Sequence, residues 1–169
     1  MFSASELRTR RMTNITLLIL MAVYVLFTLR AWQWGVSVNL YIAMCTACFS
    51  VWRLRTNTGH GLVVHVAMVG ALIAALGSIS KNGGITSVTA NWLFVIPLIS
   101  GLLGGASVAR YWAVIVAFSM GGLIYADVMG WELRDQVPTA QRYYEDRIHH
   151  IMQYVVITVL SISYLKQVA

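Results

Sequence analysis

Charged residues are scarce in this sequence. Asp, Glu, Lys and Arg together make up 11% of the 169 residues, whereas soluble domains carry roughly 25%. The acidic residues are the rarest, at six against twelve Lys and Arg. With 59% hydrophobic residues and a mean hydropathy of +0.72, the chain lacks the polar side chains that cover a water-facing surface. This composition excludes an ordinary soluble domain.

Cysteine and proline are also rare, with two residues of each. Cys45 and Cys48 form a CxxC pair inside an apolar run, without a second pair or a nearby histidine. We expect them to pack as small apolar side chains, because a zinc site needs further ligands. Pro97 lies within another apolar run, where it should kink the helix and open a cavity beside Asn91 and Trp92.

Catalytic patterns are missing as well. The sequence has no nucleophile paired with an orienting base, no glycine loop suited to phosphate and no pair of carboxylates within an apolar run. We therefore predict that this segment is not an enzyme. Charge is nearly absent inside the runs and no inverted repeat is apparent, which disfavours a small transporter or channel, the third alternative.

Six apolar runs occupy most of the chain. A transmembrane helix needs about 20 largely apolar residues, and the runs approach that length. They cover residues 13–29, 36–51, 61–79, 88–103, 111–129 and 148–165. We predict an all-α polytopic membrane protein, a bundle of six transmembrane helices that forms a single domain over residues 1–169.

Basic residues at the ends of the runs predict the orientation. With the N-terminus inside, the inner segments hold the larger share of Lys and Arg and only one acidic residue, Glu6. Arg8, Arg10 and Arg11 flank the first helix, which often dominates topology. We expect both termini in the cytoplasm. Because the charge marks helix ends, it does not indicate a nucleic-acid partner.

All six tryptophans fall near the ends of runs. An indole is amphipathic and prefers the headgroup level of a bilayer, so we expect each of them to mark an interface. The outer set is Trp32, Trp34, Trp92 and Trp131, and the inner set is Trp52 and Trp112.

The four histidines raise the question of heme or metal binding. They form two pairs, His60 with His65 at the start of the third run and His149 with His150 at the start of the sixth. Residues five apart on a helix are separated by about 140° and adjacent ones by about 100°, so neither pair can clamp one iron. The pairs also open helices that run in opposite directions. Heme b would need a methionine or a second protomer as the other ligand.

Simpler roles are open for the same histidines. His60 and His149 are interpreted as solvated helix ends. His65 should lie about one turn inside the hydrocarbon, where an ionisable group is costly. It either bridges two helices as a neutral, hydrogen-bonded imidazole or takes part in sensing.

The densest polar segment is 142–150. On a helix, Glu145 faces His149 and Asp146 faces His150, each at a spacing of four. This arrangement either binds a divalent cation, responds to pH or forms a solvated collar. We expect the sixth helix to begin near Thr139, after Pro138.

Two groups of residues are therefore candidates for ligand sensing. The outer group is Tyr143, Glu145, Asp146, His149 and His150, and the group for an intramembrane pocket is Asn91, Trp92 and His65. Small residues predict close helix packing. They are Gly70, Ala74 and Ser78 on one face of the third helix, and Gly101 and Gly105 at the end of the fourth.

One segment resembles a known family. It contains Gly83-Gly84-Ile85-Thr86-Ser87, then Asn91-Trp92, Pro97-Leu98 and Gly101 to Gly105. The pattern is similar to GG-x-x-S…W…P-L…G…G in the six-helix membrane modules of bacterial receptors, where the module precedes a histidine kinase, a diguanylate cyclase or a class III adenylyl cyclase. Some cyclase relatives carry a four-histidine diheme site. Two histidines on each of two helices depart from that pattern of one ligand per helix.

The resemblance implies a dimeric sensor in the bacterial inner membrane, truncated here before a cytoplasmic effector of a two-component or cyclase system. We expect a signal-input domain that perceives a small-molecule ligand outside or within the membrane and relays it through the sixth helix. Its partners are then membrane lipid, a second copy and the ligand. The alternative is a heme-b-binding redox or quinone sensor, or an electron-transfer anchor.

Overall fold

The computed structural model describes residues 4–31, 38–55, 59–131 and 139–168. Within these residues the chain is all-α, with six α-helices, two short 3-10 helices and no strand. In chain order they are α1 (Ala4–Ala31), α2 (Val38–Arg55), α3 (His60–Lys81), η2 (Gly84–Thr86), η3 (Val88–Asn91), α4 (Trp92–Gly104), α5 (Ala106–Val128) and α6 (Thr139–Val168).

The helices follow the six apolar runs and differ from them at the ends. α6 begins at Thr139, as predicted, and α1 extends to Ala4, well before its apolar run. The fourth run divides into η3 and α4, which contains Pro97. A 3-10 turn at the start of an α-helix is common. Here it leaves α4 with only 13 residues.

Three of the described helices are long and apolar enough to cross a membrane. These candidate spans are Thr9–Leu29, His60–Lys81 and Ala106–Val128. Leu40–Arg53 and Val88–Gly104 are shorter apolar helices. Length and composition thus indicate a membrane protein.

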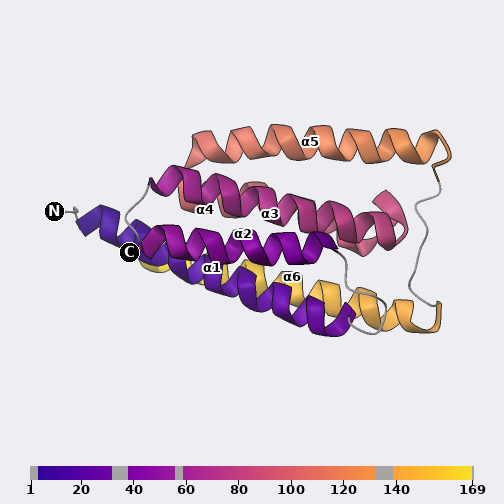
Figure 1. The fold of residues 1–169 in the computed structure, drawn as a ribbon, viewed down its shortest axis with the longest axis horizontal. Helices are drawn as coiled ribbons and strands as arrows, with labels where there is room; N and C mark the ends of the chain where they lie inside the picture. The colour runs from indigo at the N-terminus through magenta and orange to yellow at the C-terminus, as the bar shows by residue number, and fades with distance from the viewer. Residues whose placement is uncertain (1–3, 32–37, 56–58, 132–138, 169) are drawn as a thin grey trace.

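The helices lie side by side along one axis (Figure 1). α5 forms one edge and packs on α4, and α4 packs on α3. α2 packs between α3 and α1, whereas α6 packs against α1, α4 and η3. The beginning of α1 and the end of α6 lie at the same end of the bundle. The first helix and the last therefore run in opposite directions.

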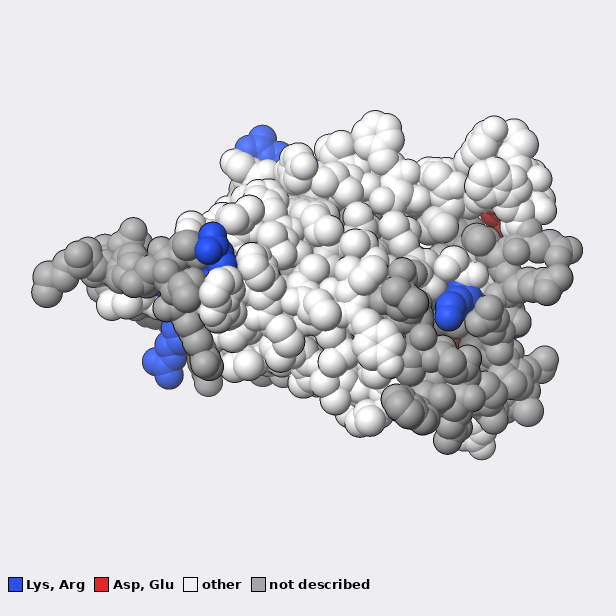
Figure 2. Space-filling view, in the orientation of Figure 1, with Lys and Arg blue, Asp and Glu red and all other residues white. Residues whose placement is uncertain are grey.

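The outer surface is poor in charge along the length of the helices. Figure 2 shows Lys and Arg near the two ends of the molecule, with uncharged side chains between them. Large apolar side chains are exposed on α5, including Phe118, Tyr125 and Val128. An apolar band with charged ends suits a protein surrounded by lipid.

One narrow face of α6 is buried. His149, Gln153, Val156 and Leu160 are its buried residues among those whose side chains are described. Their spacing of four, three and four keeps them on one side of a helix. The Nε2 of Gln153 donates to the carbonyl oxygen of Val88 at 3.5 Å. α6 is therefore held along one seam, with two polar residues toward its beginning and two apolar ones further on.

α2 and α3 approach closely at Gly70, as its small size predicted. A Cβ atom at this position would overlap the hydroxyl of Thr46 and lie 2.9 Å from the Thr46 Cβ and 3.5 Å from the Ala43 Cα. Rotation of Thr46 moves its hydroxyl away but leaves its Cβ in place. A larger residue at position 70 must therefore push the two helices apart. Ala74 and Ser78, on the same face of α3, line a cavity instead.

We predict that Gly70→Ala lowers the free energy of unfolding by roughly 1–3 kcal/mol, because overpacking forces backbone shifts. Gly121→Ala is the matched control, since nothing lies within 4 Å of a Cβ there. The control should be neutral or stabilising by up to about 1 kcal/mol. SDS titration in mixed micelles, monitored by circular dichroism, measures the free energy of unfolding of both variants. Equal midpoints for the two variants would contradict the close approach.

Candidate functional site

The turn before α4 sets the position of Trp92. Gly83 and Gly84 adopt φ values of 91° and 76°, a backbone region that glycine enters without steric cost. The chain thereby reverses after α3, and the Nδ2 of Asn82 donates to the Thr89 hydroxyl at 3.0 Å. This bond fastens η3 to the end of α3. Trp92 follows directly as the first residue of α4.

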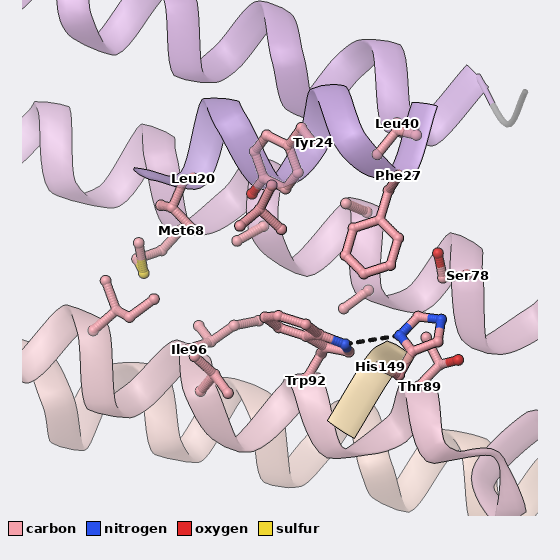
Figure 3. Close-up of a pocket in the computed structure, with 16 residues that line it drawn as sticks. Leu20, Tyr24, Phe27, Leu40, Met68, Ser78, Thr89, Trp92, Ile96 and His149 are labelled. Carbon is pink, nitrogen blue, oxygen red and sulfur yellow. Dashed lines mark hydrogen bonds between the residues drawn. The ribbon is translucent and has the colours of Figure 1, made fainter. Parts of the chain in front are cut away.

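Trp92 is hydrogen-bonded to His149 of α6. Its indole Nε1 donates to His149 Nδ1 at 3.1 Å (Figure 3). His149 is buried, with 7% of its surface exposed. The two residues are 57 positions apart in the sequence, so this bond joins distant parts of the chain.

Phe27 of α1 completes a cluster of three rings. It stacks on His149 with ring centroids 4.9 Å apart and packs edge-to-face on Trp92 at 5.8 Å. Both geometries are favourable for aromatic pairs. The cluster joins α1, α4 and α6 at one point.

The hydrogen bond also determines the chemical state of His149. An indole N–H can only donate, so Nδ1 must be the unprotonated nitrogen. The imidazole is then neutral with its proton on Nε2, and neither nitrogen offers a lone pair to a metal. Iron or zinc ligation by His149 would require this bond to break.

A cavity of about 70 Å³ lies beside the ring cluster. Its wall comes from α1, α2, α3, η3, α4 and α6, and most of the lining is apolar (Figure 3). Polar groups enter it from Tyr24, Ser78, Thr89, Trp92 and His149. Apolar walls with a few polar groups are typical of small-molecule sites. The space admits only a few non-hydrogen atoms, because water itself occupies about 30 Å³.

Tyr24 is the least satisfied polar residue of this cavity. Its side chain is buried, and its hydroxyl has no hydrogen-bonding partner among the described residues. Figure 3 shows the hydroxyl directed into the cavity. An unpaired buried hydroxyl costs roughly 1–3 kcal/mol. A ligand with a hydrogen-bonding group would recover that energy.

The sequence predicted two separate sites, and the structure joins one residue from each. Trp92, from the intramembrane group, contacts His149, from the outer group. Their neighbours in sequence do not take part, since Asn91 and His150 are exposed and absent from the cavity wall. Asp146 is half-buried. The side chains of Tyr143 and Glu145 lie outside the described residues.

His60 has a different role from the one predicted. The hydroxyl of Thr13 donates to the Thr9 carbonyl at 3.0 Å, so its oxygen accepts from His60 Nε2 at 2.6 Å. His60 is half-buried and links α3 to α1. The interpretation of His60 and His149 as solvated helix ends is therefore wrong, because both imidazoles are hydrogen-bonded between helices.

His65 lies apart from the cavity and does not join Trp92 and Asn91 in a pocket. Its Nδ1 accepts a hydrogen bond of 3.2 Å from the Trp112 indole of α5, which confirms the helix-bridging alternative. Trp112 is 2% exposed. The indoles of Trp92 and Trp112 both bond to histidines of neighbouring helices, and the expectation that they mark the membrane interfaces stays a prediction. Trp52 and Trp131 are exposed, whereas Trp32 and Trp34 lie outside the described residues.

The described residues contain no cluster of metal ligands, and their two cysteines form no disulfide. No three His, Cys, Asp or Glu residues come together in the part of the chain that the structure describes. Cys45 and Cys48 are free and exposed on α2. The expectation that they serve as small apolar side chains rather than as a metal or redox site stays a prediction.

Sequence reasoning missed Tyr24 and Phe27. A phenol in the middle of the apolar run 13–29 is a signal that could have identified Tyr24, since its hydroxyl needs a partner there. Phe27 carried no such signal, because an apolar ring in an apolar run is ordinary.

We predict that Trp92 and His149 are energetically coupled. A double-mutant cycle with Trp92→Phe and His149→Gln, measured by SDS titration, should give about 1 kcal/mol, the net value of one hydrogen bond. Trp131→Phe combined with His149→Gln is the control and should give no coupling, since Trp131 is exposed. Additive effects in the first cycle would argue against the bond.

Comparisons of the chain with protein-family models, with curated proteins and with solved structures found no match. The resemblance to bacterial sensory modules therefore stays a prediction. The function has to be inferred from the cavity and from the bond between Trp92 and His149.

Proposed function

We propose that this chain is a membrane-embedded signal-input domain that binds a small, largely apolar ligand in the cavity beside Trp92 and His149. Its six helices cross a bacterial inner membrane with both termini in the cytoplasm. Two copies associate, and α6 passes the signal to a cytoplasmic effector such as a histidine kinase or a cyclase. The observation that carries this proposal is the buried, unpartnered hydroxyl of Tyr24, directed into an apolar cavity.

The composition of the wall supports a particular ligand class. Leu20, Met68 and Ile96 supply apolar contacts, and Tyr24 supplies one hydroxyl that can donate or accept. No Lys, Arg, Asp or Glu lines the cavity in the described part of the chain. An ion would lose its hydration there without a counter-charge. The ligand is therefore uncharged, with a hydroxyl or carbonyl group that pairs with Tyr24.

The small size of the cavity connects binding to α6. A ligand of more than a few atoms fits only if part of the wall moves. Among the described residues, α6 contributes His149 to the wall and packs along one seam. A ligand that binds better when α6 is displaced shifts the population toward that state. Ligand binding is then transmitted as a change in the position of α6.

The hydrogen bonds of the histidines favour the signal-input proposal over heme binding. Trp92 and Trp112 donate to the Nδ1 atoms of His149 and His65. In each of these imidazoles the remaining nitrogen carries the proton. His60 already uses its Nε2 proton on Thr13. An axial ligand would have to break one of these bonds first.

We predict that Tyr24 discriminates between 4-fluorophenol and fluorobenzene, which have the same ring with and without a hydroxyl. In nanodiscs, 19F NMR should show saturable binding with fluorophenol preferred. Tyr24→Phe should reduce that preference about fivefold, as one hydrogen bond of about 1 kcal/mol requires. Tyr125→Phe is the control, because Tyr125 is exposed on α5. Empty nanodiscs correct for partition, and the absence of saturable binding would refute the cavity as a ligand site.

We also predict that Ala75→Leu acts like a bound ligand, because the added carbons enter the cavity that Ala75 lines. Hydrogen exchange of α6 amides around residues 149–160 should become faster, with exchange in α4 and α5 unchanged. Ala113→Leu adds the same volume at an exposed position of α5 and should leave α6 unaffected. Unchanged exchange in α6 for both variants would contradict the coupling.

A further inference from the structure

A second hollow lies between α3 and α5, and its lining shares no residue with the cavity beside Tyr24. It is a groove of about 560 Å³, within the range of roughly 300–1,000 Å³ that is usual for small-molecule sites. α3 and α5 each pack on α4 but have little direct contact with each other. The hydrogen bond from the Trp112 indole to His65 is what joins them at the groove.

His65 brings an unpaired hydrogen-bond donor to the wall of this groove. Because an indole N–H can only donate, His65 Nδ1 is the acceptor, and Nε2 carries the proton of the neutral ring. Nε2 makes no hydrogen bond with any of the described residues. The His65 side chain is half-buried, so a molecule in the groove can contact it.

The depth of His65 makes an unpaired donor costly. His65 lies five residues inside the candidate span His60–Lys81, roughly 7.5 Å along the helix axis. Tyr111, whose ring centroid is 5.5 Å from that of His65, lies five residues inside Ala106–Val128. At this depth little water is present to pair with a polar group. An acceptor on a molecule in the groove would therefore remove the cost of the unpaired Nε2 proton.

The rest of the wall restricts the chemistry of that molecule. No Lys, Arg, Asp or Glu lines the groove in the described part of the chain, so a charged group would have no counter-charge there. The hydroxyl of Tyr111 is a second donor beside His65. A carbonyl suits two donors, because its oxygen accepts two hydrogen bonds and brings no hydrogen that needs a partner. The remaining contacts are mostly apolar and come from Val69, Leu72, Val108 and Ile115.

We infer that this groove binds an uncharged, lipid-soluble ketone, whose carbonyl oxygen accepts hydrogen bonds from His65 Nε2 and the Tyr111 hydroxyl. Its apolar groups lie against Val69, Leu72 and Ile115, which follow the two donors toward the middle of the candidate spans. The inference requires that the chain lies in a membrane but not that the cavity beside Tyr24 binds a ligand, so either can fail alone.

Two probes that differ only at the carbonyl test the inference, 4,4′-difluorobenzophenone and 4,4′-difluorodiphenylmethane. Both are too large for the cavity of about 70 Å³ beside Tyr24. With the full chain in nanodiscs, 19F NMR should show saturable binding after subtraction of partition into empty nanodiscs. The ketone should bind about fivefold more tightly, which is the effect of one net hydrogen bond.

Substitution of the exposed donor gives the cleanest comparison. Tyr111→Phe should reduce the preference for the ketone and leave the fold intact, because the Tyr111 side chain is exposed. Tyr125→Phe, an equally exposed phenol at the other end of α5, is the matched control and should keep the preference. Tyr24→Phe should keep it as well, which separates this groove from the cavity.

Substitution of His65 tests the buried donor. His65→Leu should abolish the preference, and His65→Gln should retain most of it, because the amide can accept from Trp112 and still donate to the ketone. If His65→Leu does not fold, the comparison of Tyr111→Phe with Tyr125→Phe still decides the question.

Three outcomes would overturn the inference. Equal binding of the two probes, or an unchanged preference in Tyr111→Phe, would show that these donors do not recognise a carbonyl. Tighter ketone binding in nanodiscs of ether-linked phosphatidylcholine, which has no ester carbonyl, would show that the carbonyl of a phospholipid is the natural occupant. A dimer that Tyr111→Phe dissociates, without saturable binding of either probe, would show that a second copy occupies the groove.

Discussion

The constraint on which this structure depends is that a polar side chain surrounded by hydrocarbon must find its hydrogen bond within the protein. The helices satisfy the backbone groups. Among the side chains, three imidazoles meet the requirement by pairing across helices: His60 with Thr13, His65 with Trp112 and His149 with Trp92. These bonds fasten α1 to α3, α3 to α5 and α4 to α6. Tyr24 does not meet it among the described residues, nor does the side-chain oxygen of Asn14, and the Tyr24 hydroxyl is the one of these two that faces the cavity.

The two tryptophan–histidine pairs differ in their surroundings. Trp92 and His149 are enclosed by Phe27 and the cavity wall, so the space beside them suits a small ligand. Trp112 and His65 border an open groove between α3 and α5. The same contact thus borders an enclosed cavity in one case and an open groove in the other.

The sequence predicted the helices well and the site only in part. Apolar runs and Pro138 located the helices, including the start of α6 at Thr139, because these signals are local. The pairing of Trp92 with His149 depends on which helices are neighbours, and no local pattern contains that. Asn91 and Trp92 were expected to act together, yet adjacent residues already lie about 100° apart on an α-helix and about 120° apart in a 3-10 turn such as η3. As a result Asn91 faces outward, whereas Trp92 faces the cavity.

The buried seam of α6 has a mechanical consequence. Its residues are spaced by four, three and four, which is the spacing of a heptad seam. Val168, at the end of α6, is about 29 Å from His149 at a rise of 1.5 Å per residue. A rod conserves its angle of rotation along its length. If α6 rotates about its axis at His149, its far end therefore rotates by the same angle. The side chains at that end then face a new direction, while the other helices stay in place.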